Sequence, residues 1–188
     1  MDLLLTTRAR RVALLDQLRD AELTYAEVGA TAGWLPPDAQ PLRRTVAIGR
    51  GDRVFARAAD AILGWRMHHL AGLDVVASTP TAQVGTTLLV TFVRGLPIGL
   101  SAPCRVVDVV DADDRRGFTY GTLPGHPEAG EERFEVSRDA DGTIRLHLVA
   151  FSRHATAATR ALGPATSVGQ RLVTHRYVQA TRRAAAGR

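Results

Sequence analysis

The feature that most constrains the fold of this sequence is a run of strand-like segments that a long amphipathic helix follows. Between Leu73 and Phe151 the segments alternate apolar and polar residues or form short apolar runs. Turn-forming residues separate them, most clearly Asp141-Gly142, a pair typical of hairpins. Strands joined by such short turns pair antiparallel. We expect six of them, at residues 73–78, 86–93, 105–110, 117–123, 132–137 and 143–151.

Helical patterns lie on both sides of this region. Residues 8–20 fit a first helix, residues 45–48 a short strand, and Asp52 an N-cap for a helix that continues to about Met67. Trp65 completes the apolar stripe of that helix. The last helix is expected from Pro164, with residues 182–188 fraying at its end. Its expected stripe consists of Ala165, Val168, Leu172, Val173, Tyr177 and Ala180.

The passage between the first helix and the first strand is rich in Gly and Pro and is expected to be irregular through Pro41. It contains Trp34 and Leu35, so we expect it to pack on the body of the protein. We therefore predict a single domain in which residues 1–42 form an N-terminal extension and residues 43–188 form the body.

This order of elements predicts an α+β helix-grip fold. In that fold a curved antiparallel sheet, here of about seven strands, wraps a long C-terminal helix. The space between sheet and helix can hold a small apolar molecule, because pockets of this kind are the commonest ligand sites. Bulky side chains can equally fill it as ordinary core, and the sequence leaves both alternatives open.

Composition narrows the class of protein. The single cysteine, Cys104, excludes a disulfide framework and any multi-cysteine metal site, and it favours a reducing, cytoplasmic setting. No apolar segment has the length of a signal-peptide core or of a membrane helix. We expect a soluble cytoplasmic protein without a cofactor.

The longest motif is Gly-Phe-Thr-Tyr-Gly-Thr-Leu-Pro-Gly-His-Pro-Glu-Ala-Gly-Glu-Glu-Arg-Phe at residues 117–134. It resembles the signature of the bacterial and plant family catalogued as domain of unknown function 1990. Further agreement comes from residues 23–25, 28–31, 48–51, 103–107, 151–153 and 176–177. His154 departs from the pattern, since the family is expected to carry Pro there. The resemblance implies the helix-grip fold of START-type lipid carriers and birch-pollen-allergen-like proteins, and it implies no reaction.

The same motif gathers polar side chains at one end of a hairpin. Tyr120, His126, Glu131 and Glu132 are the candidates for holding the polar end of a ligand, or for acid–base chemistry. A Gly- and Pro-rich turn with side-chain-to-backbone hydrogen bonds gives the same composition. Arg153 is a further ligand candidate, or a buried partner of Glu131 or Glu132.

Other side chains do not decide between a ligand site and a structural role. Trp65 and Tyr177 can line a cavity or simply fill the core. His126 and Glu128 lack a third ligand at metal spacing, and the adjacent His68 and His69 point apart on a helix. No residue pattern predicts a catalytic nucleophile, so we assign no catalytic residue and no metal.

The charge of the chain suggests a third class of function, an interaction with an acidic molecule. All 24 basic residues are arginine, the net charge is +5 and the pI is about 10.5. The excess is uneven: residues 108–141 hold ten acidic residues and four arginines, whereas residues 142–188 hold eight arginines and no acidic residue. Because the two blocks can offset each other in one body, nucleic acid is not favoured as a partner.

We predict a binding module for an apolar small molecule. The alternatives are a cyclase- or hydrolase-like enzyme in the same cavity and an Arg-rich partner of an acidic molecule.

Overall fold

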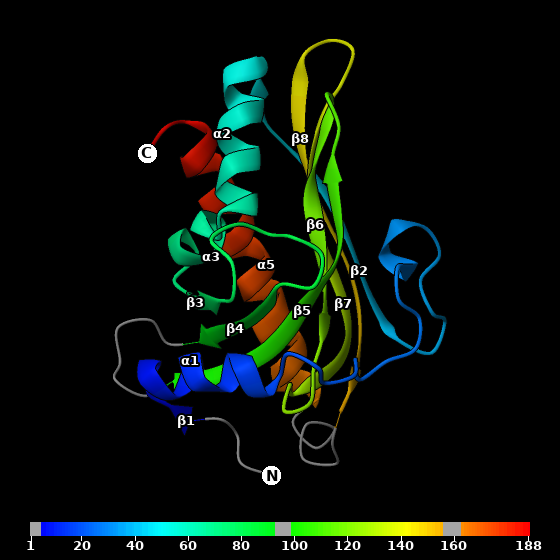
Figure 1. Ribbon diagram of the computed structural model, residues 1–188. Helices are drawn as coiled ribbons and strands as arrows, with labels where there is room; N and C mark the ends of the chain where they lie inside the picture. The colour runs from blue at the N-terminus through cyan, green and yellow to red at the C-terminus, as the bar shows by residue number, and fades with distance from the viewer. Residues whose placement is uncertain (1–4, 93–98, 156–162) are drawn as a thin grey trace.

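The computed structural model of the chain describes residues 5–92, 99–155 and 163–188 (Figure 1). Side chains are described for residues 7–92, 101–155 and 171–188. The helical elements are α1 (Arg8–Gln17), the single 3-10 turn η1 (Ala30–Ala32), α2 (Asp52–Leu63), α3 (Arg66–Leu70) and α5 (Gly163–Ala185). The strands are β1 (Leu5–Thr6), β2 (Gln40–Arg50), β3 (Asp74–Ala77), β4 (Thr87–Phe92), β5 (Gly99–Asp111), β6 (Arg115–Thr122), β7 (Glu128–Arg138) and β8 (Thr143–His154).

The strands form one antiparallel sheet in the order β2-β8-β7-β6-β5-β4-β3, and β1 adds to β5. Helices α2, α3 and α5 lie against one face, the inner face, and the segment that contains η1 lies against the outer face (Figure 1). The core sits between the inner face and these helices. Its central side chains are at most 1% exposed: Phe118, Phe134, Val136, Ile144, Leu146 and Leu148. This is the expected α+β helix-grip fold.

Strand β2 is longer than the sequence indicates. It runs over eleven residues from Gln40, including Pro41, and pairs with β8 from Gln40↔Ser152 to Arg50↔Thr143. The expectation that the passage stays irregular through Pro41 is therefore wrong. Because β2 is the edge of the sheet and most of its residues are exposed, it lacks a clear apolar alternation and can contain proline.

The helix expected to continue to Met67 is interrupted. Helix α2 ends at Leu63, and after Gly64 the backbone of Trp65 adopts the left-handed conformation, with φ 64°. A second short helix, α3, then begins at Arg66. Asp52 is the first residue of α2 and Gly51 occupies the capping position, so the N-cap expectation is also wrong.

The N-terminal extension crosses the outer face of the sheet, but the Trp34 side chain, which was expected to pack on the body, does not do so. Trp34 is 67% exposed, against expectation, while Leu35 is half-buried and Pro36 is buried. Tyr25 does pack on the sheet, edge-on to Phe151 with ring centroids 5.6 Å apart.

The C-terminal end of α5 packs against the body, so the expected fraying is wrong. Ala184 and Ala185 are at most 2% exposed, and the Arg182 guanidinium donates to the carbonyl oxygen of Ala47 at 3.2 Å. Leu172 is 50% exposed despite its place in the expected stripe. The side chains of Ala165 and Val168 lie outside the described residues. Within the described residues, no helix has the length and apolarity to cross a membrane.

Candidate functional site

A carboxyl group and a phenol face each other on the inner face of the sheet. Glu132 on β7 lies directly opposite Tyr120 on β6 in the strand register. Side chains alternate between faces along a strand, so Glu132 shares the inner face with Phe134 and Val136. The Tyr120 hydroxyl donates a hydrogen bond to Glu132 Oε2 at 2.8 Å.

Helix α5 brings a second phenol to this pair. Tyr177 is 2% exposed and packs edge-on to Phe134, with ring centroids 5.1 Å apart. Burial, and then the nearby charge of Glu132, raise the pKa of Tyr177 and that of Tyr120 well above the ordinary value. Both hydroxyls therefore stay protonated at neutral pH. Three of the candidate site residues, Tyr120, Glu132 and Tyr177, thus lie together.

The environment of Glu132 is unusual for a carboxyl group. Burial raises its pKa to about 7, although the hydrogen bond from Tyr120 lowers that pKa and the charge of Glu128 raises it further. Among the residues that the structure describes, Glu132 has Tyr120 as its hydrogen-bond partner and forms no ion pair. A group with this pKa changes its charge near physiological pH.

Helix α3 contributes His68, whose place in the core was not expected from the sequence. His68 is fully buried, and its ring lies 5.3 Å from that of Tyr177 and 5.4 Å from that of Phe134. Neither ring nitrogen has a hydrogen-bond partner among the described residues. Burial lowers the pKa of His68 to about 3, so the ring is neutral. Its position three residues after the apolar Trp65 was the signal that could have placed it inside.

Burial is uneven along the inner face. Near the β7–β8 turn, inward-facing residues such as Val136 and Ile144 are fully buried. Further along the same strands, Glu132 and its neighbour across the register, Ala150, are only half-buried. Val173 on α5 is likewise only partly buried against the core. The inner face around Glu132 is therefore less completely buried than the part near the β7–β8 turn.

Two other candidates, Glu131 and Arg153, lie on the outer face of the sheet. Glu131 accepts hydrogen bonds from the Tyr25 hydroxyl at 2.9 Å, the Gly29 amide at 2.7 Å, and the amide and hydroxyl of Thr31 at 3.1 and 2.5 Å. Its carboxylate thus fastens the N-terminal extension. Because Glu131 and Glu132 are adjacent in a strand, they must point to opposite faces.

Arg153 does not pair with either glutamate, so that expectation is wrong. Its guanidinium binds Glu27 at 2.6 Å and Asp38 at 2.7 Å, both in the extension on the outer face. These carboxylates lie more than 100 positions away in the chain, where no local pattern reveals them. The structure therefore does not bring Arg153 to Tyr120.

The remaining candidates have structural partners. His126 lies in the turn between β6 and β7, where the Glu128 amide donates to its Nδ1 at 3.0 Å, and burial lowers its pKa to about 4. This geometry matches the structural alternative for the hairpin. Trp65 packs on Phe118 with centroids 5.2 Å apart, and its indole N–H donates to the Thr79 carbonyl oxygen at 3.3 Å.

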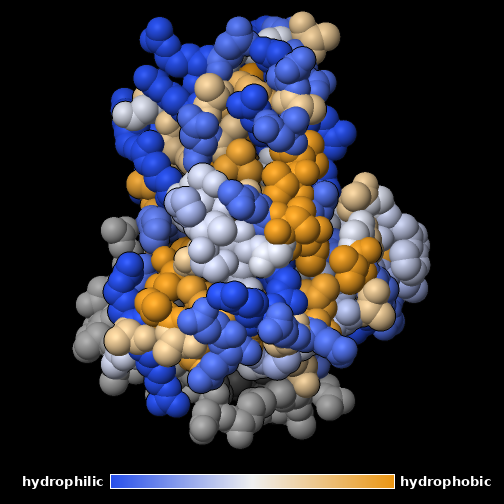
Figure 2. All heavy atoms as spheres, viewed as in Figure 1, coloured by the Kyte–Doolittle hydropathy of each residue, from blue (hydrophilic) through white to orange (hydrophobic). Residues whose placement is uncertain are grey.

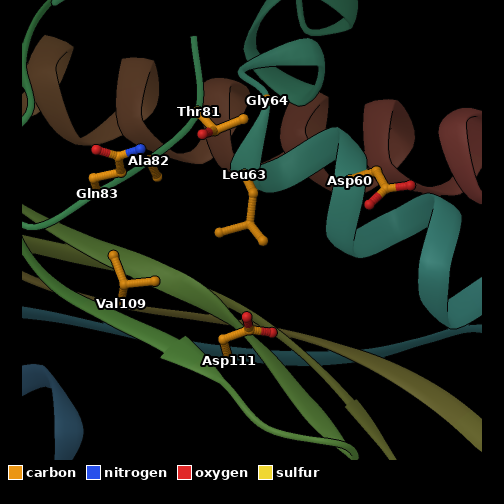
Figure 3. A pocket seen from close by; sticks show the side chains of 8 residues that line it. All are labelled: Asp60, Leu63, Gly64, Thr81, Ala82, Gln83, Val109 and Asp111. Carbon is orange, nitrogen blue, oxygen red and sulfur yellow. The ribbon is translucent and has the colours of Figure 1, made fainter. Parts of the chain in front are cut away.

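A separate pocket of about 520 Å³ opens between the end of α2, the loop before β4 and strand β5 (Figure 3). In Figure 3 the Leu63 side chain points into it from α2, above Val109. Asp60 and Asp111 supply carboxylates, but Asp111 already pairs with Arg116 at 2.9 Å. None of the candidate residues lines this pocket.

The described side chains hold no group of three or more His, Cys, Asp or Glu residues placed to bind a metal. Cys104 is fully buried and burial raises its pKa, which keeps the thiol protonated.

The fold and site define a helix-grip protein whose inner face carries a half-buried carboxyl group beside aromatic rings. A family model described as domain of unknown function (DUF1990) matches residues 24–180. The chain belongs to this family, as the motif at residues 117–134 indicates. A UPF0548 protein of Deinococcus radiodurans is 34% identical over 189 residues, which covers 95% of this chain and 96% of the relative.

Solved structures show the same fold at low sequence identity. A hypothetical protein from Helicobacter pylori matches 86% of this chain and 97% of its own, with a TM-score of 0.61 and 9% identity. The di-domain ARO/CYC protein BexL, from the BE-7585A biosynthetic pathway, matches 81% of this chain and 52% of its own, with a TM-score of 0.52 and 14% identity.

Proposed function

We propose that this protein binds a small, mainly apolar molecule between the inner face of the sheet and α5. The observation that carries the proposal is the incomplete burial of the inner face around Glu132 and Ala150, beside fully buried core residues such as Phe134 and Leu148. Apolar walls with a few convergent polar groups are typical of ligand sites. Here Tyr120, Tyr177 and Glu132 supply the polar groups.

A larger side chain at Ala150 tests this proposal. A phenyl group there occupies the space beside Glu132, so Ala150→Phe should weaken binding of the neutral probe N-phenyl-1-naphthylamine by about tenfold or more. Ala47→Phe is the matched control, because Ala47 is exposed on edge strand β2. Probe fluorescence gives the affinity, and circular dichroism checks the fold of both variants. Equal affinity in wild type and Ala150→Phe would contradict the proposal.

Acid–base catalysis on the bound molecule is a second candidate function. The pKa of about 7 for Glu132 favours it, because a group that titrates near neutrality transfers protons efficiently in both directions. In that case Glu132→Gln abolishes turnover of a substrate that the variant still binds. Turnover unaffected by this substitution excludes Glu132 as the acid or base.

A further inference from the structure

The charge of Glu132 has no counter-ion among the described residues. Its one partner there, the Tyr120 hydroxyl, supplies a single proton, whereas a carboxylate can accept about four hydrogen bonds. Removing a carboxylate from water without a partner of opposite charge is unfavourable. The half-buried Glu132 side chain therefore retains acceptor capacity within reach of a ligand.

The surrounding rings supply no positive charge to this carboxyl group. Tyr120 and Tyr177 lie 5.4 and 5.1 Å from Phe134 between ring centroids, so three aromatic rings gather on the side of the carboxyl. His68, which also packs on this cluster, is neutral and does not supply the missing charge.

The charge of the whole molecule acts in the opposite direction. With a net charge of +5, the protein attracts anions non-specifically and repels cations. A preference for a cation is therefore a property of the local site and cannot come from the overall charge.

We infer that the inner-face site selects an amphiphilic amine, with its ammonium group on Glu132 and its apolar body against the sheet and α5. This inference rests on the proposed binding function and adds the chemical class of the ligand. The ammonium donates hydrogen bonds to the carboxylate oxygens, beside the Tyr120 hydroxyl that donates to the same group. A carboxylic acid of the same length meets a like charge at this position.

Three probes that share an eight-carbon chain separate the alternatives: octylamine, 1-octanol and octanoate. By calorimetry at pH 8, we expect octylamine to bind at least about tenfold more tightly than 1-octanol, and octanoate to bind most weakly. In Glu132→Gln the advantage of octylamine over 1-octanol disappears. Asp60→Asn is the matched control, because it removes a carboxylate from the separate surface pocket.

The pH dependence gives a second readout. Octylamine stays protonated between pH 6 and 8, since alkylamines titrate near the lysine value of about 10.4. The carboxylate fraction of Glu132 rises through its pKa of about 7, so octylamine affinity should increase roughly tenfold over this interval. The titratable groups that interact with Glu132 are Tyr120, Tyr177, Cys104 and Glu128, and His68 lies beside Tyr177. The pKa values of the two phenols and the thiol are raised and that of His68 is lowered, so these groups keep their protonation states.

The outcomes distinguish the inference from the binding function. If 1-octanol binds as tightly as octylamine, or if the preference for octylamine survives Glu132→Gln, the inference is overturned and the binding function stands. If Asp60→Asn removes the preference, the amine binds the surface pocket and the inference is overturned. If none of the probes binds, including N-phenyl-1-naphthylamine, both the inference and the proposed function fail.

Discussion

Two adjacent glutamates in β7 serve opposite faces of one sheet. Glu131 accepts four hydrogen bonds that fix the N-terminal extension, while Glu132 points inward and, among the described residues, accepts a hydrogen bond from the phenol of Tyr120. Strand alternation alone separates them. The contrast shows why residue type cannot assign a role here: both side chains are glutamates, and their environments make one a structural anchor and the other a titratable site.

The raised pKa of Glu132 predicts a stability effect with a definite sign. The folded protein binds this proton more tightly than the unfolded chain, so the wild-type protein loses stability as pH rises from about 4.5 to about 7. A shift of this size corresponds to about 3 kcal/mol. Glu132→Gln removes the loss, and we expect it to be more stable than wild type at pH 8 and similar at pH 4.5.

Urea unfolding of both proteins at pH 4.5, 6 and 8 measures this difference. Glu128→Gln serves as a comparison, because Glu128 acts on Glu132 only through its charge. A free-energy difference between wild type and Glu132→Gln that stays constant with pH would contradict the expected environment of Glu132.

Single residues were predictable from the sequence where the contacts are local. The period of two in the motif puts Phe118 and Tyr120 on one face, and the structure has both on the inner face. The partners of Glu131 and Arg153 lie about 100 or more positions away, so their identity depends on how the extension crosses the sheet.

Among the elements, the N-terminal extension depends on close approach to the sheet. A side chain at Gly121 would overlap the ring and hydroxyl of Tyr25, and one at Gly130 would overlap the Phe151 carbonyl. These glycines of the long motif thus permit packing, and their role is structural. The glycines of the motif therefore allow the extension to pack closely on β6 and allow β8 to pair closely with β7.

Gly121→Ala should release the extension and leave the sheet in place. Overpacking of this kind costs about 1 to 3 kcal/mol. We therefore expect the Gly29 and Thr31 amides, which donate to Glu131, to exchange with solvent roughly tenfold faster or more. Hydrogen exchange by NMR measures this effect.

Gly33→Ala is the control, since a Cβ at Gly33 meets no atom within 4 Å. Unchanged protection of the Gly29 and Thr31 amides in Gly121→Ala would show that Tyr25 does not hold the extension.

The sequence predicted elements best where one face is buried. Strands β4 to β8 follow their apolar pattern, whereas the exposed edge strand β2 carries little pattern and was recognised for only four of its eleven residues. The break between α2 and α3 was missed because apolar periodicity continues through Trp65 although the backbone does not remain helical.

For the whole molecule, the balance of buried titratable groups determines the pH of greatest stability. His68 and His126 have lowered pKa values of about 3 and about 4, so the unfolded chain binds their protons more tightly, and stability is lost as pH falls below about 6.5. Glu132 acts in the opposite sense. Between pH 4.5 and 6.5 two histidines outweigh one glutamate, and above 6.5 only the glutamate acts.

We therefore expect the stability maximum between about pH 6 and 7. His68→Leu removes a buried imidazole that has no hydrogen-bond partner in the described part of the chain, and it should flatten the loss of stability on the acid side. Urea midpoints from pH 4.5 to 7.5 in wild type and His68→Leu measure this change. A variant as acid-sensitive as wild type would contradict the neutral state of His68.

For the whole molecule, the order of strands and helices was enough to predict the helix-grip arrangement, because few topologies accommodate a meander followed by one long helix. Charge was a weaker guide. Figure 2 shows hydrophilic residues over much of the surface, especially the end where α2 begins. Arg133, Arg145 and Arg153 are all engaged in ion pairs, which accounts for part of the basic excess without an acidic partner.

The way the extension is fastened also sets an order of events in folding. Tyr25 contacts Glu131, 106 positions later, and Glu27 contacts Arg153, 126 positions later. These contacts form only after β7 and β8 exist, and bringing such distant segments together is slow. The extension leaves the ribosome before the sheet but can settle only after it. Docking of the extension on the outer face therefore requires a complete sheet.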